Sequence, residues 1–216
     1  MPLLKLQSFS NYSAWALWQI TENENNLYQI LQPGIIDNHF LHTISHSERR
    51  KGSLAARICS KILAEQFLGV SYQGIVKDLH NYPSLAYLPN VHLSISHTQG
   101  YAVAMIHTQQ PVGIDIELER EKIIRLANKF LHPKEHTWVN KDITKLTLIW
   151  SAKEALYKCY GRKLLSFSQN LQITPFEINA NTGILLANVF LQKQVQSHHL
   201  SYQRIDRNYW LSWVSF

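Results

Sequence analysis

The sequence lacks the features that mark membrane-spanning, exported and disulfide-bonded proteins. It has no run of about 18 apolar residues, which argues against a transmembrane helix. The opening MPLLKLQSFS has no basic segment followed by a long apolar stretch, so it does not read as a signal peptide. Only 2 cysteines occur, Cys59 and Cys159, in apolar helical patterns that predict buried free thiols. We therefore expect a cytoplasmic protein with no membrane partner.

Acidic residues are scarce relative to basic ones. The 216 residues include 15 Asp and Glu against 21 Lys and Arg, which gives a formal charge of +6 at pH 7. This balance suits a nucleic acid, a phosphorylated small molecule or an acidic protein. Zinc-finger spacing, RNP-like motifs and Gly/Arg-rich tails are missing, and the 11 histidines have no metal-ligand spacing. Since 45% of the residues are hydrophobic, a folded core is expected.

The apolar periodicity indicates an α+β protein. Helices are predicted at 26–31, 47–67 (with Ser47 as N-cap), 122–130, 134–139 and 147–160. Strands are predicted at 14–20, 91–96, 101–107, 112–117, 171–174, 184–190, 200–205 and 209–214. Short links join the strands between 91 and 117, which predicts an antiparallel meander.

Both halves of the chain repeat one order of elements: a strand, a long helix and a group of strands. We therefore predict two similar α/β lobes, related by a pseudo-twofold axis and packed side by side. Each would contain an antiparallel sheet and one long helix. The N-terminal lobe would span residues 1–110 and the C-terminal lobe residues 111–216.

The segment VGIDIE at 112–117 places two carboxylates on one predicted strand. Alternate residues of a strand share a face, so Asp115 and Glu117 point one way and the isoleucines point into the core. Two carboxylates roughly 7 Å apart repel each other unless water or a cation lies between them. Oxygen ligands at this spacing suit Mg²⁺. A solvent-facing strand with ordinary acidic residues is the alternative.

Two further segments carry chemically suggestive residues. In WSAKEALYK, Trp150, Glu154 and Lys158 are four residues apart and share a helix face. That face could line a pocket for a metal and a phosphate, or hold an ordinary exposed Glu–Lys pair. In LSISH, Ser96 and His97 lie at a strand end, where they could hold a phosphate or move a proton. The alternative is a histidine bonded to the backbone of a turn.

GIDIE followed by WSAKEALYK, with LSISH upstream and FLHPKE between them, resembles the paired signature of the 4'-phosphopantetheinyl transferases. The similarity is to the two-lobed, surfactin-synthetase-activating type and runs from about residue 49 to 161. It implies transfer of the phosphopantetheine arm of coenzyme A to a serine of an acyl or peptidyl carrier protein, with release of 3',5'-ADP. The resemblance also implies a requirement for Mg²⁺, which would neutralise the charge of the diphosphate.

The resemblance assigns roles to individual residues. Asp115, Glu117 and Glu154 would bind Mg²⁺, and Lys158 would contact the phosphate or assist proton transfer. Glu135 occupies the position of a carboxylate that acts as general base toward the carrier serine. Residues expected at the coenzyme A site are Arg49 or Arg50, Tyr82, Ser96, His97, Trp150 and Ser151.

One departure from the family pattern concerns coenzyme A. The family commonly has Gly-Lys-Pro where this chain has Asn81-Tyr82-Pro83, so Tyr82 replaces a lysine. A tyrosine can stack on adenine or donate one hydrogen bond, but it carries no positive charge. Either the affinity for coenzyme A is reduced, or Lys77 or another nearby base compensates.

The resemblance also bears on assembly and partners. A chain with both lobes is expected to be a monomer with its active site at the lobe interface. The positive charge would attract both an acidic carrier protein and the anionic coenzyme A. Two alternatives differ in class: a relative that binds coenzyme A or a carrier without transfer, and a nucleic-acid-binding module suggested by charge alone.

Overall fold

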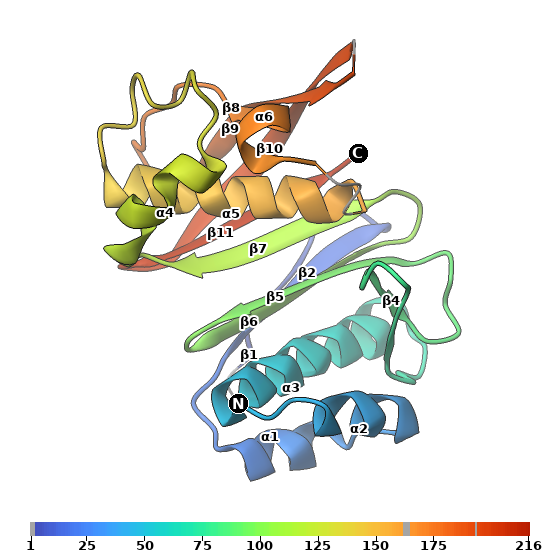
Figure 1. Ribbon diagram of the computed structural model, residues 1–216. Helices are drawn as coiled ribbons and strands as arrows, with labels where there is room; N and C mark the ends of the chain where they lie inside the picture. Colours follow the sequence, from blue (N-terminus) through green and yellow to red (C-terminus); the bar gives the residue numbers. More distant parts are fainter. Residues whose placement is uncertain (1–2, 162–164, 193) are drawn as a thin grey trace. The chain divides into compact units, whose positions relative to one another are not determined.

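The computed structural model describes residues 3–161, 165–192 and 194–216. The chain divides into two compact units, Met1–Val112 with Ser215 and Gly113–Val214 with Phe216 (Figure 1). Each unit contains one sheet and one long helix, which confirms the α+β class. Among the described residues, no helix combines the length and the apolar character that a membrane crossing needs.

The first unit is built on a six-stranded sheet in the order β1-β2-β6-β5-β4-β3, with antiparallel neighbours throughout. Its strands are β1 (Leu3–Ser8), β2 (Ser13–Gln19), β3 (Ile75–Lys77), β4 (Pro83–Leu85), β5 (His92–Thr98) and β6 (Tyr101–His107). Its helical segments are α1 (Glu24–Leu31), α2 (Ile35–His42), α3 (Ser47–Ile62) and the π-helix η1 (Leu63–Phe67). In Figure 1, α3 lies between the strands and the helices α1 and α2.

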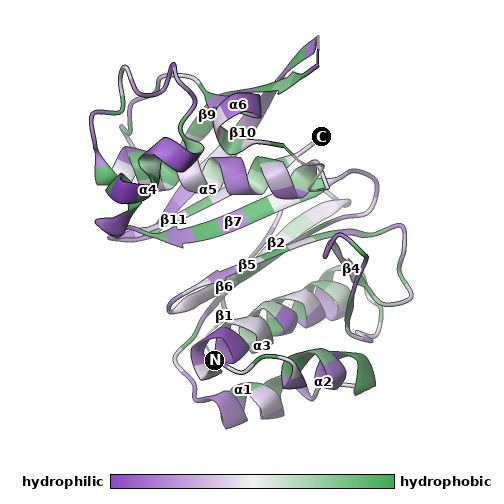
Figure 2. Cartoon of the chain, in the orientation of Figure 1, coloured by the Kyte–Doolittle hydropathy of each residue, from purple (hydrophilic) through white to green (hydrophobic). Residues whose placement is uncertain are grey.

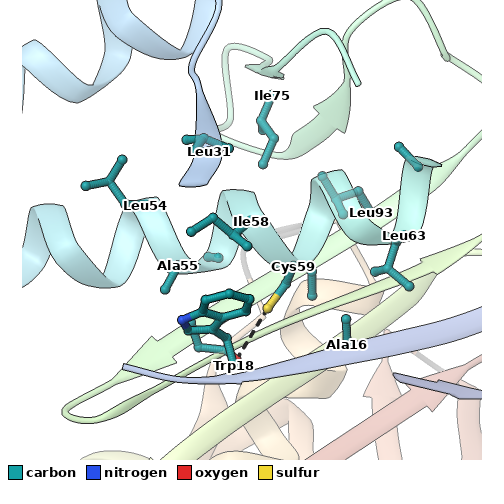
Figure 3. Packing of buried hydrophobic residues seen from close by; sticks show 14 of the residues in the cluster. Ala16, Trp18, Leu31, Leu54, Ala55, Ile58, Cys59, Leu63, Ile75 and Leu93 are labelled. Atoms are coloured by element: carbon teal, nitrogen blue, oxygen red, sulfur yellow. Dashed lines mark hydrogen bonds between the residues drawn. The ribbon is translucent and has the colours of Figure 1, made fainter. Parts of the chain in front are cut away.

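The apolar stripe of α3 builds the core of the first unit. Figure 3 shows this contact, in which side chains of α3 meet those of the strands and α1. The labelled residues are Ala16, Trp18, Leu31, Leu54, Ala55, Ile58, Cys59, Leu63, Ile75 and Leu93. The Cys59 thiol is free and buried, which confirms the prediction of a buried free thiol, and burial raises its pKa.

The second unit contains a five-stranded sheet in the order β7-β11-β10-β9-β8. Its strands are β7 (Val112–Leu118), β8 (Leu171–Ile173), β9 (Thr182–Leu191), β10 (Gln194–Asp206) and β11 (Tyr209–Ser215). Its helices are α4 (Lys122–Phe130), α5 (Ile143–Cys159) and α6 (Phe167–Asn170). Hydrophilic and hydrophobic residues alternate around α4 (Figure 2), and its last residue, Phe130, is buried in the core. Cys159 is the second buried free thiol, also as predicted.

Three local predictions were wrong, and one helix was missed. His46, not Ser47, is the N-cap of α3, and the Ser47 hydroxyl donates instead to Glu24. The predicted meander ends at β6, because β7 joins the second sheet beside β11. The segment 134–139 forms turns rather than a helix, and it leads to Asn140 and Lys141, which adopt positive φ. Helix α2, directly after the Pro33-Gly34 turn, was missed.

Candidate active site

Strand β7 and helix α5 pack closely because Gly113 has no side chain. A Cβ at this position would lie 1.8 Å from the carbonyl oxygen of Ala155, so any other residue would force the strand away from the helix. Ile114 and Ile116 are fully buried, as the alternation of the strand predicts. Asp115 is also buried, with 3% exposure, so the interpretation of β7 as an ordinary solvent-facing strand is wrong for this residue.

Asp115 is held by two residues of α5. The Nζ of Lys158 donates to Asp115 Oδ1 at 2.8 Å and to the carbonyl oxygen of Ile114 at 3.0 Å. Ser151 donates its hydroxyl to the Asp115 carbonyl oxygen at 3.2 Å. Because Ser151 is fully buried, its hydroxyl joins helix to strand. This geometry assigns Ser151 a structural role and replaces the interpretation of Ser151 as a coenzyme A ligand.

Glu117 lies beside Trp150 and shares its surroundings with two other acids. The indole Nε1 of Trp150 donates to Glu117 Oε1 at 3.0 Å, and the indole ring also packs on Phe130 and Phe167. Burial, together with the negative charges of Asp115 and Glu154, raises the pKa of the Glu117 carboxyl to about 7, while Trp150 and Lys158 oppose this shift. The structure thus brings together the residues that the two motifs suggested: Asp115, Glu117, Trp150, Glu154 and Lys158.

The carboxylates of Asp115, Glu117 and Glu154, which we call the carboxylate cluster, suit a hard divalent cation. Within the described part of the chain, no three His, Cys, Asp or Glu side chains already converge on a metal position. Mg²⁺ does not need such a cage, because it usually takes one or two carboxylates and completes its coordination with water and substrate phosphates. A cation beside Glu117 would also relieve the repulsion that raises its pKa. The chemistry of Asp115, Glu117 and Glu154 therefore fits Mg²⁺.

Glu135 has a different environment from the one that we expected. It is fully buried, and its Oε2 accepts from Lys153 Nζ and from the backbone N–H of His132, each at 2.6 Å. Its Oε1 accepts from the backbone N–H of Ile173, also at 2.6 Å. A carboxylate with three buried donors is not placed to take a proton from a carrier serine. This geometry assigns Glu135 a structural role and replaces the general-base interpretation.

A second cluster lies within the first unit. A cavity of about 220 Å³ is lined by residues of α3, β3 and β5, and none of its described lining residues is acidic. The lining includes three of the predicted coenzyme A ligands, Arg49, Ser96 and His97. Lys77 and Arg57 line the same cavity, and each places its cationic group 4.4 Å from the centroid of the Phe40 ring. The cavity therefore has the character of an anion-binding pocket, and we call it the basic pocket.

The structure distinguishes the two neighbouring arginines at the start of α3. The Nε of Arg50 pairs with Glu24 Oε1 at 2.5 Å, and its Nη1 donates to the carbonyl oxygen of Ile44. Arg50 is not among the residues that line the basic pocket, whereas Arg49 is. Arg49 is thus the arginine available to a ligand, and Arg50 joins α3 to α1.

Tyr82 lies in the turn that precedes β4 and is not among the residues lining the basic pocket. Its backbone N–H donates to Asp78 Oδ1 at 2.7 Å. Lys77 faces Pro83 across the β3–β4 pair and lines the pocket. The positive charge on this hairpin is therefore supplied by Lys77.

Sequence reasoning missed Arg57, which is 1% exposed. Its Nε donates to Asp37 Oδ1 at 2.8 Å, and its Nη1 donates to the Ser53 hydroxyl at 2.6 Å. The Tyr72 hydroxyl donates to Asp37 Oδ2 at 2.8 Å, and burial, with the nearby Asp37 charge, raises the Tyr72 pKa. Arg57 Nη2 is buried without a hydrogen-bond partner among the described residues. The signal was available, because an arginine within the apolar stripe of α3 needs a buried partner or a ligand.

Comparisons with known proteins find sequence similarity to one superfamily. The sequence model of the 4'-phosphopantetheinyl transferase superfamily matches residues 111–214. The 4'-phosphopantetheinyl transferase gsp of Aneurinibacillus migulanus is 33% identical over 78 residues, which are 34% of this chain and 32% of that protein. A 4'-phosphopantetheinyl transferase of Bacillus subtilis is 27% identical over 126 residues, 55% of this chain and 56% of that protein.

Two further matches complete the comparison. The 4'-phosphopantetheinyl transferase Sfp of Bacillus subtilis (strain 168) is 31% identical over 87 residues, 38% of each chain. A solved holo-(acyl-carrier-protein) synthase from Bacillus anthracis in complex with CoA covers 44% of this chain and 92% of that one, at 19% identity and a TM-score of 0.38. The matches span from one third to just over half of the curated relatives. Residues 111–214 are thus similar to the 4'-phosphopantetheinyl transferase superfamily, as the motifs of this region suggested.

Proposed function

We propose that this protein transfers the 4'-phosphopantetheine arm of coenzyme A to a serine of an acyl or peptidyl carrier protein and releases 3',5'-ADP. The observation that carries the proposal is the carboxylate cluster of β7 and α5, with Lys158 bound to Asp115 at 2.8 Å. This cluster lies within the region that matches the superfamily. In the reaction a bond forms between the serine oxygen and the β-phosphorus, and the bond from this phosphorus to the 3',5'-ADP oxygen breaks.

Asp115, Glu117 and Glu154 would hold Mg²⁺, which supplies neutralisation of the charge that develops on the diphosphate. Trp150 orients Glu117 through its 3.0 Å hydrogen bond. Lys158 is half-buried and can contact a phosphate oxygen or assist proton transfer. Because Glu135 is buried in the core, we propose that a carboxylate of the carboxylate cluster accepts the serine proton.

The basic pocket would hold the anionic groups of coenzyme A. Arg49, Arg57 and Lys77 contribute positive charge, and Ser96 and His97 contribute shorter hydrogen-bonding side chains. Arginine suits phosphate because its planar fork of donors matches the phosphate oxygens. Lys77 in this pocket weighs against the non-catalytic alternative, which was suggested by the missing lysine at position 82.

Further parts of the proposal concern the partners and the setting of the reaction. The net charge of +6 would increase the rate of encounter with an acidic carrier protein and with coenzyme A. We infer that the protein acts as a monomer, since one chain contains both units. We also infer that it acts in the cytoplasm, without a nucleic-acid or membrane partner.

The test is intact-mass spectrometry of an apo carrier protein incubated with this protein, coenzyme A and Mg²⁺. We expect a gain of about 340 Da on the carrier that is lost with EDTA, because the metal neutralises the diphosphate. Acyl and peptidyl carriers are both tested, since either class fits the proposal. Failure to modify any carrier under these conditions would contradict the proposal.

Matched glutamate variants locate the chemistry. Glu154→Gln should abolish transfer, because it removes one charge from the carboxylate cluster and leaves the shape of the side chain. Glu177→Gln is the control, since Glu177 is an exposed acid that pairs with Lys145 at 3.0 Å outside the cluster. Full activity in Glu154→Gln would rule out its assignment as a metal ligand.

A further inference from the structure

We propose that Gly52 is a positioning residue for coenzyme A binding, because its missing side chain leaves the space in which the His97 imidazole lies. The inference rests on the proposed function, in which His97 contacts an anionic group of coenzyme A. Gly52 is buried in α3, and His97 is an exposed residue of β5 that lines the basic pocket. Both residues belong to the first unit.

Close contact between the imidazole and α3 is the first observation. A Cβ built on Gly52 would lie 2.4 Å from His97 Nδ1, 2.7 Å from Cγ and 2.9 Å from Cε1. Real Cβ atoms essentially never approach another heavy atom within 3.0 Å, so even alanine would displace the ring. Glycine is therefore required for this position of the imidazole.

The same distances orient the ring. The three atoms nearest to Gly52 form the Nδ1 side of the imidazole, so this side faces α3 and Nε2 lies on the side away from the helix. Nε2 is thus the nitrogen that can donate to a ligand in the basic pocket, beside Ser96 and Arg49. Displacement of the ring would move this donor.

Strand register explains why a histidine meets the helix here. Leu93, Ile95 and His97 alternate along β5, and they pair with Ile106, Ala104 and Ala102 of β6. Four of these apolar residues belong to the core that α3 covers, and Ile95 packs against it. His97 therefore ends a row of core residues, where the ring reaches the helix and Gly52 makes room for it.

Helix propensity gives no other reason for the glycine. Glycine is unfavourable in a helix interior relative to alanine, and Gly52 is not one of the glycines with positive φ. The displaced group would be the end of a movable side chain, so the clash can be relieved by rotation of His97. Alanine at this position should therefore keep the fold and move only the histidine.

The experiment measures coenzyme A affinity by isothermal titration calorimetry, together with the thermal midpoint, for Gly52→Ala in the full chain. We expect an equal or higher thermal midpoint and about 10-fold weaker binding, because one hydrogen bond to a charged group is lost. Gly34→Ala is the matched control, since a Cβ there meets nothing within 4 Å. Its affinity should equal that of the wild type.

A double-mutant cycle tests whether Gly52 acts through His97. In a His97→Ala background, where the ring is absent, Gly52→Ala should cause no further loss of affinity. A further loss there, with a lowered thermal midpoint, would show a general packing defect and overturn the inference. Unchanged affinity in Gly52→Ala alone would overturn it as well. If the wild type and Gly34→Ala both fail to bind coenzyme A, the proposed function fails and this inference falls with it.

Discussion

The buried ion pair between Glu135 and Lys153 makes a sharp prediction about stability. Both side chains are fully buried, and Lys153 Nζ donates to Glu135 Oε2 at 2.6 Å. The same ammonium also donates to the carbonyl oxygens of Phe130 and Phe167, at 2.8 and 3.1 Å. Lys153→Met would leave the Glu135 carboxylate buried without its counter-charge. Loss of one partner of a buried pair costs about 3–5 kcal/mol, so we expect a decrease of this size in the free energy of unfolding.

The neutral double variant should recover much of this loss. In Lys153→Met with Glu135→Gln, no buried charge is left, and the glutamine oxygen can still accept from the backbone N–H of Ile173. We therefore expect the double variant to be more stable than Lys153→Met alone. The assay is urea unfolding followed by tryptophan fluorescence, with Glu177→Gln as a surface control.

The pH dependence of stability tests the same prediction independently. Burial raises the pKa of Glu135 above its usual value, and Lys153 opposes this shift. In Lys153→Met the opposing charge is gone, so the folded state binds the Glu135 proton more tightly than the unfolded state does. Stability of this variant should therefore fall as pH rises above about 4.5. A decrease in the free energy of unfolding below about 1 kcal/mol, with no such pH trend, would refute the reasoning, because an unpaired buried carboxylate destabilises a protein by more than this.

Three further predictions concern other contacts. Gly113→Ala should lower the free energy of unfolding by about 3 kcal/mol and abolish carrier modification, because the added Cβ would overlap the Ala155 carbonyl oxygen. Thermal unfolding measures the loss of stability, and intact-mass spectrometry of the carrier measures the loss of activity. Arg57→Leu should lower the free energy of unfolding in urea by about 3–5 kcal/mol, since Asp37 loses its buried partner. A smaller decrease in the double variant Arg57→Leu with Asp37→Leu would support this cause. His107 Nδ1 accepts two backbone N–H groups of the turn after β6, and burial, together with His92, lowers its pKa. Because the pKa of His107 is lower in the folded state than in the unfolded state, the free energy of unfolding should decrease as pH drops below about 6.5. The decrease should be smaller in His107→Asn, whose Oδ1 can still accept a hydrogen bond but does not titrate. Equal pH profiles of the two proteins in urea unfolding would contradict this prediction.

Local sequence patterns predicted the parts of the fold that local physics decides. The bounds of α4 at 122–130 and of β6 at 101–107 agree with the prediction, because apolar periodicity and turn residues are contained within each segment. The common face of Trp150, Glu154 and Lys158 follows from helix geometry alone. These features need no knowledge of distant segments.

Pairing between distant segments was not predictable in the same way. The short link through Pro111 suggested that β7 would pair with β6, yet β7 lies beside β11, some 90 residues later in the chain. The turn at 134–139 is held by Glu135, whose partners come from β8 and α5. Neither arrangement leaves a local signal, because each depends on which distant residues the core brings together.

The same limit applied to the assignment of charged residues, and WSAKEALYK shows why. Lys153 and Glu154 are neighbours in the sequence, but Lys153 points into the core and Glu154 is a half-buried member of the carboxylate cluster. Because successive residues of a helix are rotated by about 100°, the side chains of Lys153 and Glu154 lie on different faces of α5. The motif therefore contains both the lysine of the ion pair that anchors α5 and the charges that face β7. Charge and spacing alone identify the motif, whereas burial and partners decide which of its members can touch a substrate.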